Sequence, residues 1–137
     1  MSDVAVVFDT SALLSYVDGN ISVGELIAEI ADEGRQAVVP AVCLAEARAR
    51  VSDGLAAAHL LLLTTTPTIR VEPLAGDRFG RADPIWRVGE FALEARGDVG
   101  IGHAVHAALT YEAYVASARP DAVAGVLPAG WIVLDLR

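Results

Sequence analysis

The segment Val4-Ala5-Val6-Val7-Phe8-Asp9-Thr10-Ser11 decides the fold of this chain of 137 residues. Its first five residues are all apolar and three of them are β-branched, which is typical of a strand buried on both faces in the middle of a parallel sheet. Asp9 ends the run, so its carboxylate is expected at the carboxyl edge of that strand. A short helix is predicted directly afterwards, with Thr10 or Ser11 as its cap.

The rest of the chain alternates between short apolar runs and longer helical patterns. Further strands are predicted over residues 36–40, 69–72, 114–116 and 131–134, and helices over residues 21–33, 42–51, 56–63, 84–97, 99–112 and 120–126. The residues 64–67 are predicted to be a loop. Strands that alternate with helices imply right-handed crossovers, so we expect one α/β domain over residues 1–137, with a central parallel sheet of four to five strands flanked by helices in three layers.

The composition limits the classes of function. Hydrophobic residues make up 54% of the chain, the formal net charge is −8, and all ten basic residues are arginines. Such an acidic surface argues against a general nucleic-acid coat protein, but it leaves room for an enzyme that reaches RNA through bound cations or a local arginine cluster. The single cysteine, Cys43, excludes an internal disulfide. No apolar run is long enough for a membrane span and the first residues lack a basic leader, so the cytoplasm is predicted.

Two acidic residues are the first candidates for chemistry. Asp9 follows a buried strand, where a carboxylate is costly unless a charged or hydrogen-bonding group meets it. Its alternative role is to cap the next turn of helix. Glu46 lies early in the helix that follows the second predicted strand, and small neighbours leave space around it. Its alternative role is a solvated position on an ordinary helix.

An ordered set of motifs carries a resemblance to a known family. The motifs are residues 7–14, Val39-Pro40 with Cys43-Leu44-Ala45-Glu46, His103-Ala104 with Ala107-Ala108, Ser117-Ala118-Arg119-Pro120-Asp121, and the closing strand. Together they span the chain and resemble the PIN-domain family, particularly the VapC-type toxins of bacterial toxin–antitoxin pairs. The resemblance implies a PIN-like domain, a ribonuclease that uses Mg²⁺ or Mn²⁺ to activate water, a small antitoxin partner and a homodimer.

The resemblance also implies the roles of individual residues. Asp9 and Glu46 match the family's first two acids, Thr10 or Ser11 matches a hydroxyl that orders the site, and Ser117 matches the hydroxyl before the last acid. The expected catalytic residues are Asp9, Glu46, Asp121 and Ser117, and the expected metal ligands are Asp9, Glu46 and Asp121. Hard divalent cations prefer such carboxylate oxygens.

The sequence departs from the family at two positions. The third and fourth acids fall on His103 and Arg119. Asp121 could supply an acid if the loop is reshaped, Asp98 could do so if its helix starts late, and His103 could bind a softer metal such as Mn²⁺ or Zn²⁺. Alternatively, the Arg119 guanidinium could replace the metal beside Asp9.

Two other interpretations stay open at this stage. His103 and His106 stand three residues apart and share a helix face, which permits a zinc pair, although no third ligand accompanies them at a diagnostic spacing. The alternative function is a catalytically degenerate PIN-fold module that binds or regulates without nuclease activity. A doubly wound ligand-binding domain of another kind is disfavoured because no glycine-rich loop follows a predicted strand.

Overall fold

The computed structural model describes residues 3–76, 80 and 82–137. Its strands are β1 (Val4–Phe8), β2 (Gln36–Pro40), β3 (Ile69–Glu72), β4 (Tyr114–Ser117) and β5 (Val133–Asp135). Its helices are α1 (Thr10–Val17), α2 (Ile21–Asp32), α3 (Ala41–Arg50), α4 (Gly54–Thr65), α5 (Pro84–Glu94), α6 (Val99–Tyr111) and α7 (Pro120–Ala124). The order of elements confirms the predicted α/β alternation.

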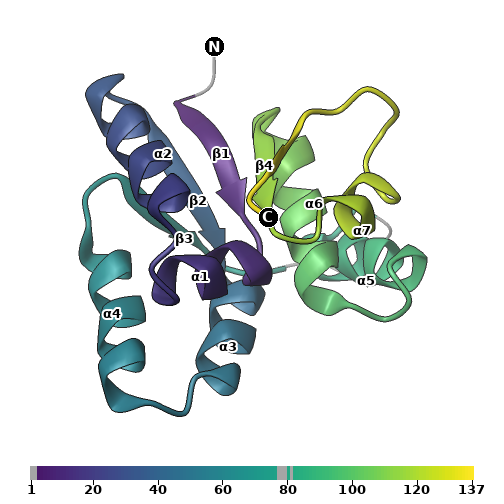
Figure 1. The fold of residues 1–137 in the computed structure, drawn as a ribbon. Coiled ribbons are helices and arrows are strands. Elements are labelled where there is room, and N and C mark those ends of the chain that lie inside the picture. Colours follow the sequence, from purple (N-terminus) through teal and green to yellow (C-terminus); the bar gives the residue numbers. More distant parts are fainter. Residues whose placement is uncertain (1–2, 77–79, 81) are drawn as a thin grey trace.

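All five strands of the described residues form one parallel sheet in the order β3-β2-β1-β4-β5. The predicted three-layer arrangement is confirmed, with helices flanking the sheet. In Figure 1, α2, α3 and α4 lie on the side of β2 and β3, whereas α5, α6 and α7 lie on the side of β4. After β1 the chain moves outward through β2 and β3, then returns to the other side of β1 as β4. The carboxyl ends of β1 and β4 therefore form the crevice at which such sheets bind ligands.

The central position of β1 follows from its composition. Val6, Val7 and Phe8 are each at most 1% exposed, as an apolar run covered on both faces requires. The strand pairs with β2 on one side and β4 on the other. Its apolar side chains join a continuous hydrophobic cluster with β2, β4, α1 and α6.

Polar caps set the starts of the helices. Asp53, Asp83 and Asp98 each accept a hydrogen bond from a backbone N–H in the first turn of α4, α5 and α6, and Pro84 opens α5 as predicted. Gly34 follows the end of α2 with a φ of +68°, a conformation that favours glycine.

Three local predictions were wrong. Asp9, rather than Thr10 or Ser11, caps α1. The predicted threonine loop begins inside α4, because Thr64 and Thr65 donate their hydroxyl groups to carbonyls one turn back and continue the helix. The last strand begins at Val133 instead of Trp131, since the Trp131 indole N–H turns inward and donates to a carbonyl of residue 113.

Gly102 allows α5 and α6 to pack against each other closely. A Cβ atom at this position would lie 2.5 Å from the Val88 carbonyl oxygen and 2.9 Å from the Ala92 nitrogen. Both atoms belong to the backbone of α5, so neither can rotate away. The glycine therefore fixes the distance between α5 and the helix that Asp98 caps.

We expect Gly102→Ala to lower the free energy of unfolding by about 1–3 kcal/mol, because the added methyl group forces the two helices apart. Gly89→Ala is the matched control. Gly89 lies in the interior of α5, and a Cβ atom added there would meet no atom within 4 Å. Alanine at this position is therefore expected to raise the free energy of unfolding by up to about 1 kcal/mol. Urea unfolding of both variants checks the pair, and equal effects would contradict this account of the packing.

Candidate metal and phosphodiester site

Asp9 lies at the crevice with its carboxylate almost fully buried. The residue is 3% exposed, and its Oδ1 atom accepts hydrogen bonds from the Ala12 N–H at 2.9 Å and the Ser11 hydroxyl at 2.7 Å. Burial raises the pKa of Asp9, while hydrogen bonds from Ser117, Ser11 and Ala12 and the charge of Arg119 lower it. Asp9 thus fills both roles considered from the sequence, since it caps α1 and also lines a pocket.

Two serines connect Asp9 to the end of β4. The hydroxyl groups of Ser11 and Ser117 lie 3.2 Å apart. Ser11 Oγ also accepts from the backbone N–H of Ala118, and Ser117 Oγ accepts from that of Arg119. Ser117 is fully buried. Both serines are therefore positioning residues, which hold the carboxylate against the loop that follows β4.

A small pocket beside Asp9 collects two further acids. It has a volume of about 20 Å³, which is room for one water molecule or an ion of similar size. Its lining residues are Asp9, Thr10, Ser11, Glu46, Arg50, Asp98, Ile101 and Arg119. Acidic residues from the end of β1, from α3 and from the start of α6 therefore line one space, and Asp9 and Glu46 are both among them.

Asp98 also lines this pocket, although its helix does not start late, which was the condition expected for that role. Its Oδ1 atom caps α6 by accepting from the Ile101 N–H, while its Oδ2 atom lies 3.3 Å from Arg119 Nη1. One oxygen of the Asp98 carboxylate therefore caps α6, while the other lies next to Arg119. The hypothesis that the Arg119 guanidinium forms an ion pair with Asp9 is corrected, because Arg119 forms its ion pair with Asp98.

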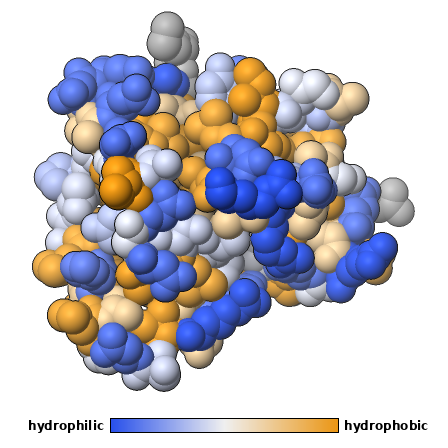
Figure 2. Space-filling view, in the orientation of Figure 1, coloured by the Kyte–Doolittle hydropathy of each residue, from blue (hydrophilic) through white to orange (hydrophobic). Residues whose placement is uncertain are grey.

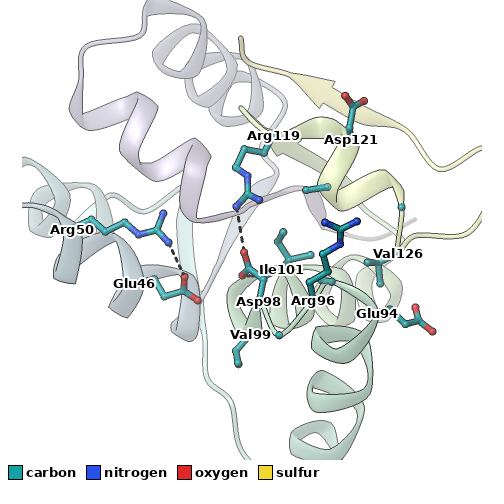
Figure 3. A pocket seen from close by; sticks show the side chains of 14 residues that line it. Glu46, Arg50, Glu94, Arg96, Asp98, Val99, Ile101, Arg119, Asp121 and Val126 are labelled. Carbon is teal, nitrogen blue, oxygen red and sulfur yellow. Dashed lines mark hydrogen bonds and ion pairs between the residues drawn. The ribbon is translucent and has the colours of Figure 1, made fainter.

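A second arginine engages Glu46. Arg50 Nη2 lies 3.7 Å from Glu46 Oε2, one helical turn away on α3. Figure 3 shows the two ion pairs facing each other across the site, with Arg96 beside Asp98. Both guanidinium groups are more than half exposed, so each pair is worth only about 0.2–1 kcal/mol. The i,i+4 spacing of Glu46 and Arg50 is the sequence signal that could have revealed this residue.

Gly100 and Thr10 complete the wall of the pocket. A Cβ atom on Gly100 would lie 2.5 Å from Glu46 Oε1 and 2.9 Å from Thr10 Oγ1, so the glycine leaves the space into which Glu46 reaches. Thr10 is 8% exposed, and its side chain lies close enough to the Cys43 thiol to lower the pKa of that thiol, against the larger effect of burial. Behind this wall the Cys43 thiol donates to the Gly100 carbonyl, and burial raises the pKa of the thiol.

Asp121 does not reach the pocket. It lies exposed in the first turn of α7, and in Figure 3 its carboxylate points away from Asp98 and Arg119. Its charge instead raises the pKa of Arg137 at the end of the chain. The loop after β4 therefore keeps Arg119, rather than an acid, next to the crevice.

His103 lies away from the pocket as well. It is 1% exposed, and its Nδ1 atom accepts from the Val42 N–H at 3.4 Å. Five residues along a helix correspond to about 140° of rotation from Asp98, so the two side chains leave α6 on different faces. Burial lowers the pKa of His103 to about 4, so its imidazole is neutral at pH 7.

The second histidine gives no zinc site with the first. Glu72 lies close enough to raise the pKa values of both His103 and His106, against the larger effect of burial. Tyr111 donates its hydroxyl to the Glu72 carboxylate. No group of three His, Cys, Asp or Glu side chains in the described part of the chain is arranged to hold a metal ion.

The acids of the pocket fit a hard divalent cation in kind, since they offer carboxylate and hydroxyl oxygens around an ion-sized space. Their present arrangement differs from a ready coordination shell, because Asp98 and Glu46 each face an arginine. A cation would have to displace those two exposed pairs. Asp9, Glu46 and Asp98 line one pocket, but they are not arranged as a group of three that holds a metal ion.

Comparisons with known proteins give no further assignment. No protein-family model matches the sequence, and none of the curated proteins matches it significantly. The resemblance to PIN-domain ribonucleases therefore stays a prediction. What the structure itself establishes is an α/β fold with a five-stranded parallel sheet and an acidic pocket at its crevice.

We expect Asp9→Asn to raise the thermal unfolding midpoint near pH 7 in the presence of a chelator. The pKa of Asp9 is higher in the folded state than in the unfolded state, because the carboxyl group is buried. The free energy of unfolding of the parent is therefore highest when this group is protonated, and it falls as pH rises through the folded pKa. The advantage of the variant should shrink as pH falls. Asp135→Asn is the control, since Arg137 lowers the pKa of that exposed aspartate; a variant at Asp9 that melts below the parent at every pH would contradict the prediction.

Proposed function

We propose that this protein is a metal-dependent endoribonuclease of the PIN-like kind, acting in the cytoplasm on RNA phosphodiesters. The observation that carries the proposal is the meeting of Asp9, Glu46 and Asp98 in one ion-sized pocket at the crevice. These acids come from segments far apart in the sequence, and burying Asp9 is costly unless a charge compensates it. A purely structural cap would not require the other two acids.

The side chains of the chain have separate tasks in this proposal. Asp9 is the fixed ligand, because Ser11, Ser117 and the Ala12 N–H hold its orientation. Glu46 and Asp98 are the adjustable ligands at the more open side of the pocket. If Mg²⁺ or Mn²⁺ were bound there, it would supply an activated water and stabilise negative charge on the phosphate.

Cleavage of single-stranded RNA in Mn²⁺ and in Mg²⁺ tests the function. We expect Asp9→Asn, Glu46→Gln and Asp98→Asn each to lower the rate on the order of 100-fold, as removal of a charged group from a preorganised site does. Asp32→Asn is the matched control and should retain the parent rate, because this exposed carboxylate at the end of α2 lies outside both the small pocket and the larger cleft. Gly100→Ala should lower the rate with the fold intact, since its methyl group meets flexible side-chain atoms of Glu46.

The results of the cleavage assay distinguish a nuclease from a binding or regulatory module without catalysis. Activity that survives in the three acid variants would indicate a contaminating nuclease and contradict the proposal. A parent protein that neither cleaves RNA nor binds Mn²⁺ would favour the alternative function, a PIN-fold binding or regulatory module without catalysis. The two arginine–carboxylate pairs are the observation that favours this alternative, because they neutralise the pocket without a metal.

We further propose that the protein forms a homodimer through α4. This helix is apolar on all sides, and Leu55, Leu61 and Leu62 are each more than 60% exposed. Figure 2 shows hydrophobic atoms gathered over this part of the molecule, at the lower left. A helix of this composition is normally covered. The same function would involve a small antitoxin with a basic segment over the cleft, which the net charge of −8 would attract.

Sedimentation velocity of the parent and of Leu62→Glu checks the dimer. We expect a dimeric parent and a monomeric variant, since a charge on the covered face leaves an unpaired buried carboxylate. Leu93→Glu is the control, because Leu93 is at least as exposed as Leu62 but lies on α5. A monomeric parent, or dimers of all three proteins, would contradict the assignment of α4.

None of the helices in the described residues has the length and apolar character needed to cross a membrane.

A further inference from the structure

The helix α3, which carries Glu46, begins without a cap of its own. Its N-cap residue is Pro40, which makes no side-chain hydrogen bond and, as a proline, has no N–H group. The other helices of eight or more residues in the described part of the chain begin at a residue whose side chain accepts such a bond, namely Asp9, Asn20, Asp53, Asp83 and Asp98. The first N–H groups of α3 therefore need an acceptor from elsewhere in the fold.

His103 supplies that acceptor from α6. Its Nδ1 atom lies 3.4 Å from the backbone nitrogen of Val42, the second residue of α3, whose N–H donates to it. This N–H group belongs to the first turn, where a capping side chain ordinarily binds. The His103 side chain belongs to a residue that is 1% exposed, so the bond joins the two helices on the inside of the molecule.

A second bond joins the same two helices. The Cys43 thiol donates to the Gly100 carbonyl oxygen at 3.1 Å. Gly100 and His103 are three residues apart on α6, so they share a face of that helix. Their partners, Val42 and Cys43, are neighbours in the first turn of α3. One face of α6 therefore holds the first turn of α3 at two adjacent residues.

The same face of α6 adjoins Glu46. A Cβ atom on Gly100 would lie 2.5 Å from Glu46 Oε1, so the Glu46 side chain occupies the space that the glycine leaves open. Glu46 lies about one turn after Val42 on α3, and Gly100 lies almost one turn before His103 on α6. The bond between His103 and Val42 therefore sets the register in which Glu46 meets Gly100, one turn away on each helix.

We propose that His103 is a positioning residue, whose neutral imidazole caps α3 and fixes where Glu46 enters the acidic pocket. This inference goes beyond the proposed function, since the cap places Glu46 in the same way whether the site cleaves RNA or only binds a partner. It also assigns the imidazole one tautomer. Nδ1 carries no hydrogen, because it accepts from Val42, and the proton therefore lies on Nε2.

The surroundings of His103 favour the neutral form that a cap requires. Its pKa is lowered to about 4, chiefly by burial and then by the charge of His106, against the opposite effect of Glu72 at the end of β3. Arg87, on α5, acts on the neighbouring His106. From α3, the partial positive charge of the helix N-terminus also disfavours an imidazolium. A protonated Nδ1 atom is a donor, so protonation would break the bond to Val42.

Amide hydrogen exchange of Val42, followed by NMR at several pH values, tests the cap. The protection factor of Val42 is divided by that of Val7, in the central strand, so that effects on overall stability cancel. His103→Asn keeps an acceptor near the place of Nδ1, whereas His103→Leu keeps a bulky side chain without an acceptor. His106→Leu is the matched control, because it also removes an imidazole from α6, three residues from the one that binds Val42. The ¹⁵N chemical shifts of the parent imidazole report its tautomer.

At pH 7 we expect His103→Leu to lower the relative protection of Val42 about fivefold, the effect of losing a typical helix cap. His103→Asn and His106→Leu should stay close to the parent. Between about pH 6.5 and pH 4 the protection of Val42 in the parent should fall as pH falls, by up to about tenfold per pH unit. The reason is that an opened imidazole takes up a proton that the closed one does not. His103→Asn should lack this step.

The acceptor, rather than the bulk of the side chain, is what these measurements isolate. Parent-like protection of Val42 in His103→Leu, or an equal loss in His103→Asn and His103→Leu, would overturn the cap. A pH step that persists in His103→Asn would do the same. An imidazole protonated on Nδ1 in the parent at pH 7 would also overturn it, and this measurement needs no variant to fold. Cleavage of RNA bears only on the proposed function, so the two proposals can fail separately.

Discussion

The buried carboxylate of Asp9 is the interaction on which the candidate site depends. Its charge is removed from water at the end of β1, and that cost requires several hydrogen-bond donors at fixed places. The Ala12 N–H comes from α1, and Ser11 reaches across to Ser117 and to the N–H of Ala118. The hydrogen bonds that stabilise the Asp9 carboxylate therefore connect the first turn of α1 to the loop after β4, across the crevice between β1 and β4.

The fold was largely predictable because its signals are local and repeated. Each strand is a short apolar run, and Asp83 and Asp98 directly precede two of the predicted helices, which they cap in the structure. The errors lie where a side chain makes an unexpected contact. Threonine hydroxyls extended α4 by bonding to its own carbonyls, and the Trp131 indole shortened the last strand. Neither contact has a periodic pattern in the sequence.

The site was predictable only in part, because position along the chain does not give the direction of a side chain. Asp9 and Glu46 follow from the ends of β1 and β2, and the structure brings them to one pocket. Asp98 was considered as a substitute acid only if its helix started late, since the sequence does not show that one oxygen can cap α6 while the other faces Arg119. His103 occupies the position expected from the family, but the rotation of α6 turns it toward the start of α3.

Cys43 gives this architecture a built-in reporter. Its thiol is fully buried, protonated because burial raises its pKa, and bonded to the carbonyl of Gly100 between α3 and α6. A thiol-specific dye can modify it only when these two helices separate. Since the chain has no other cysteine, the rate of labelling would measure how often the wall behind Glu46 opens, without any introduced probe.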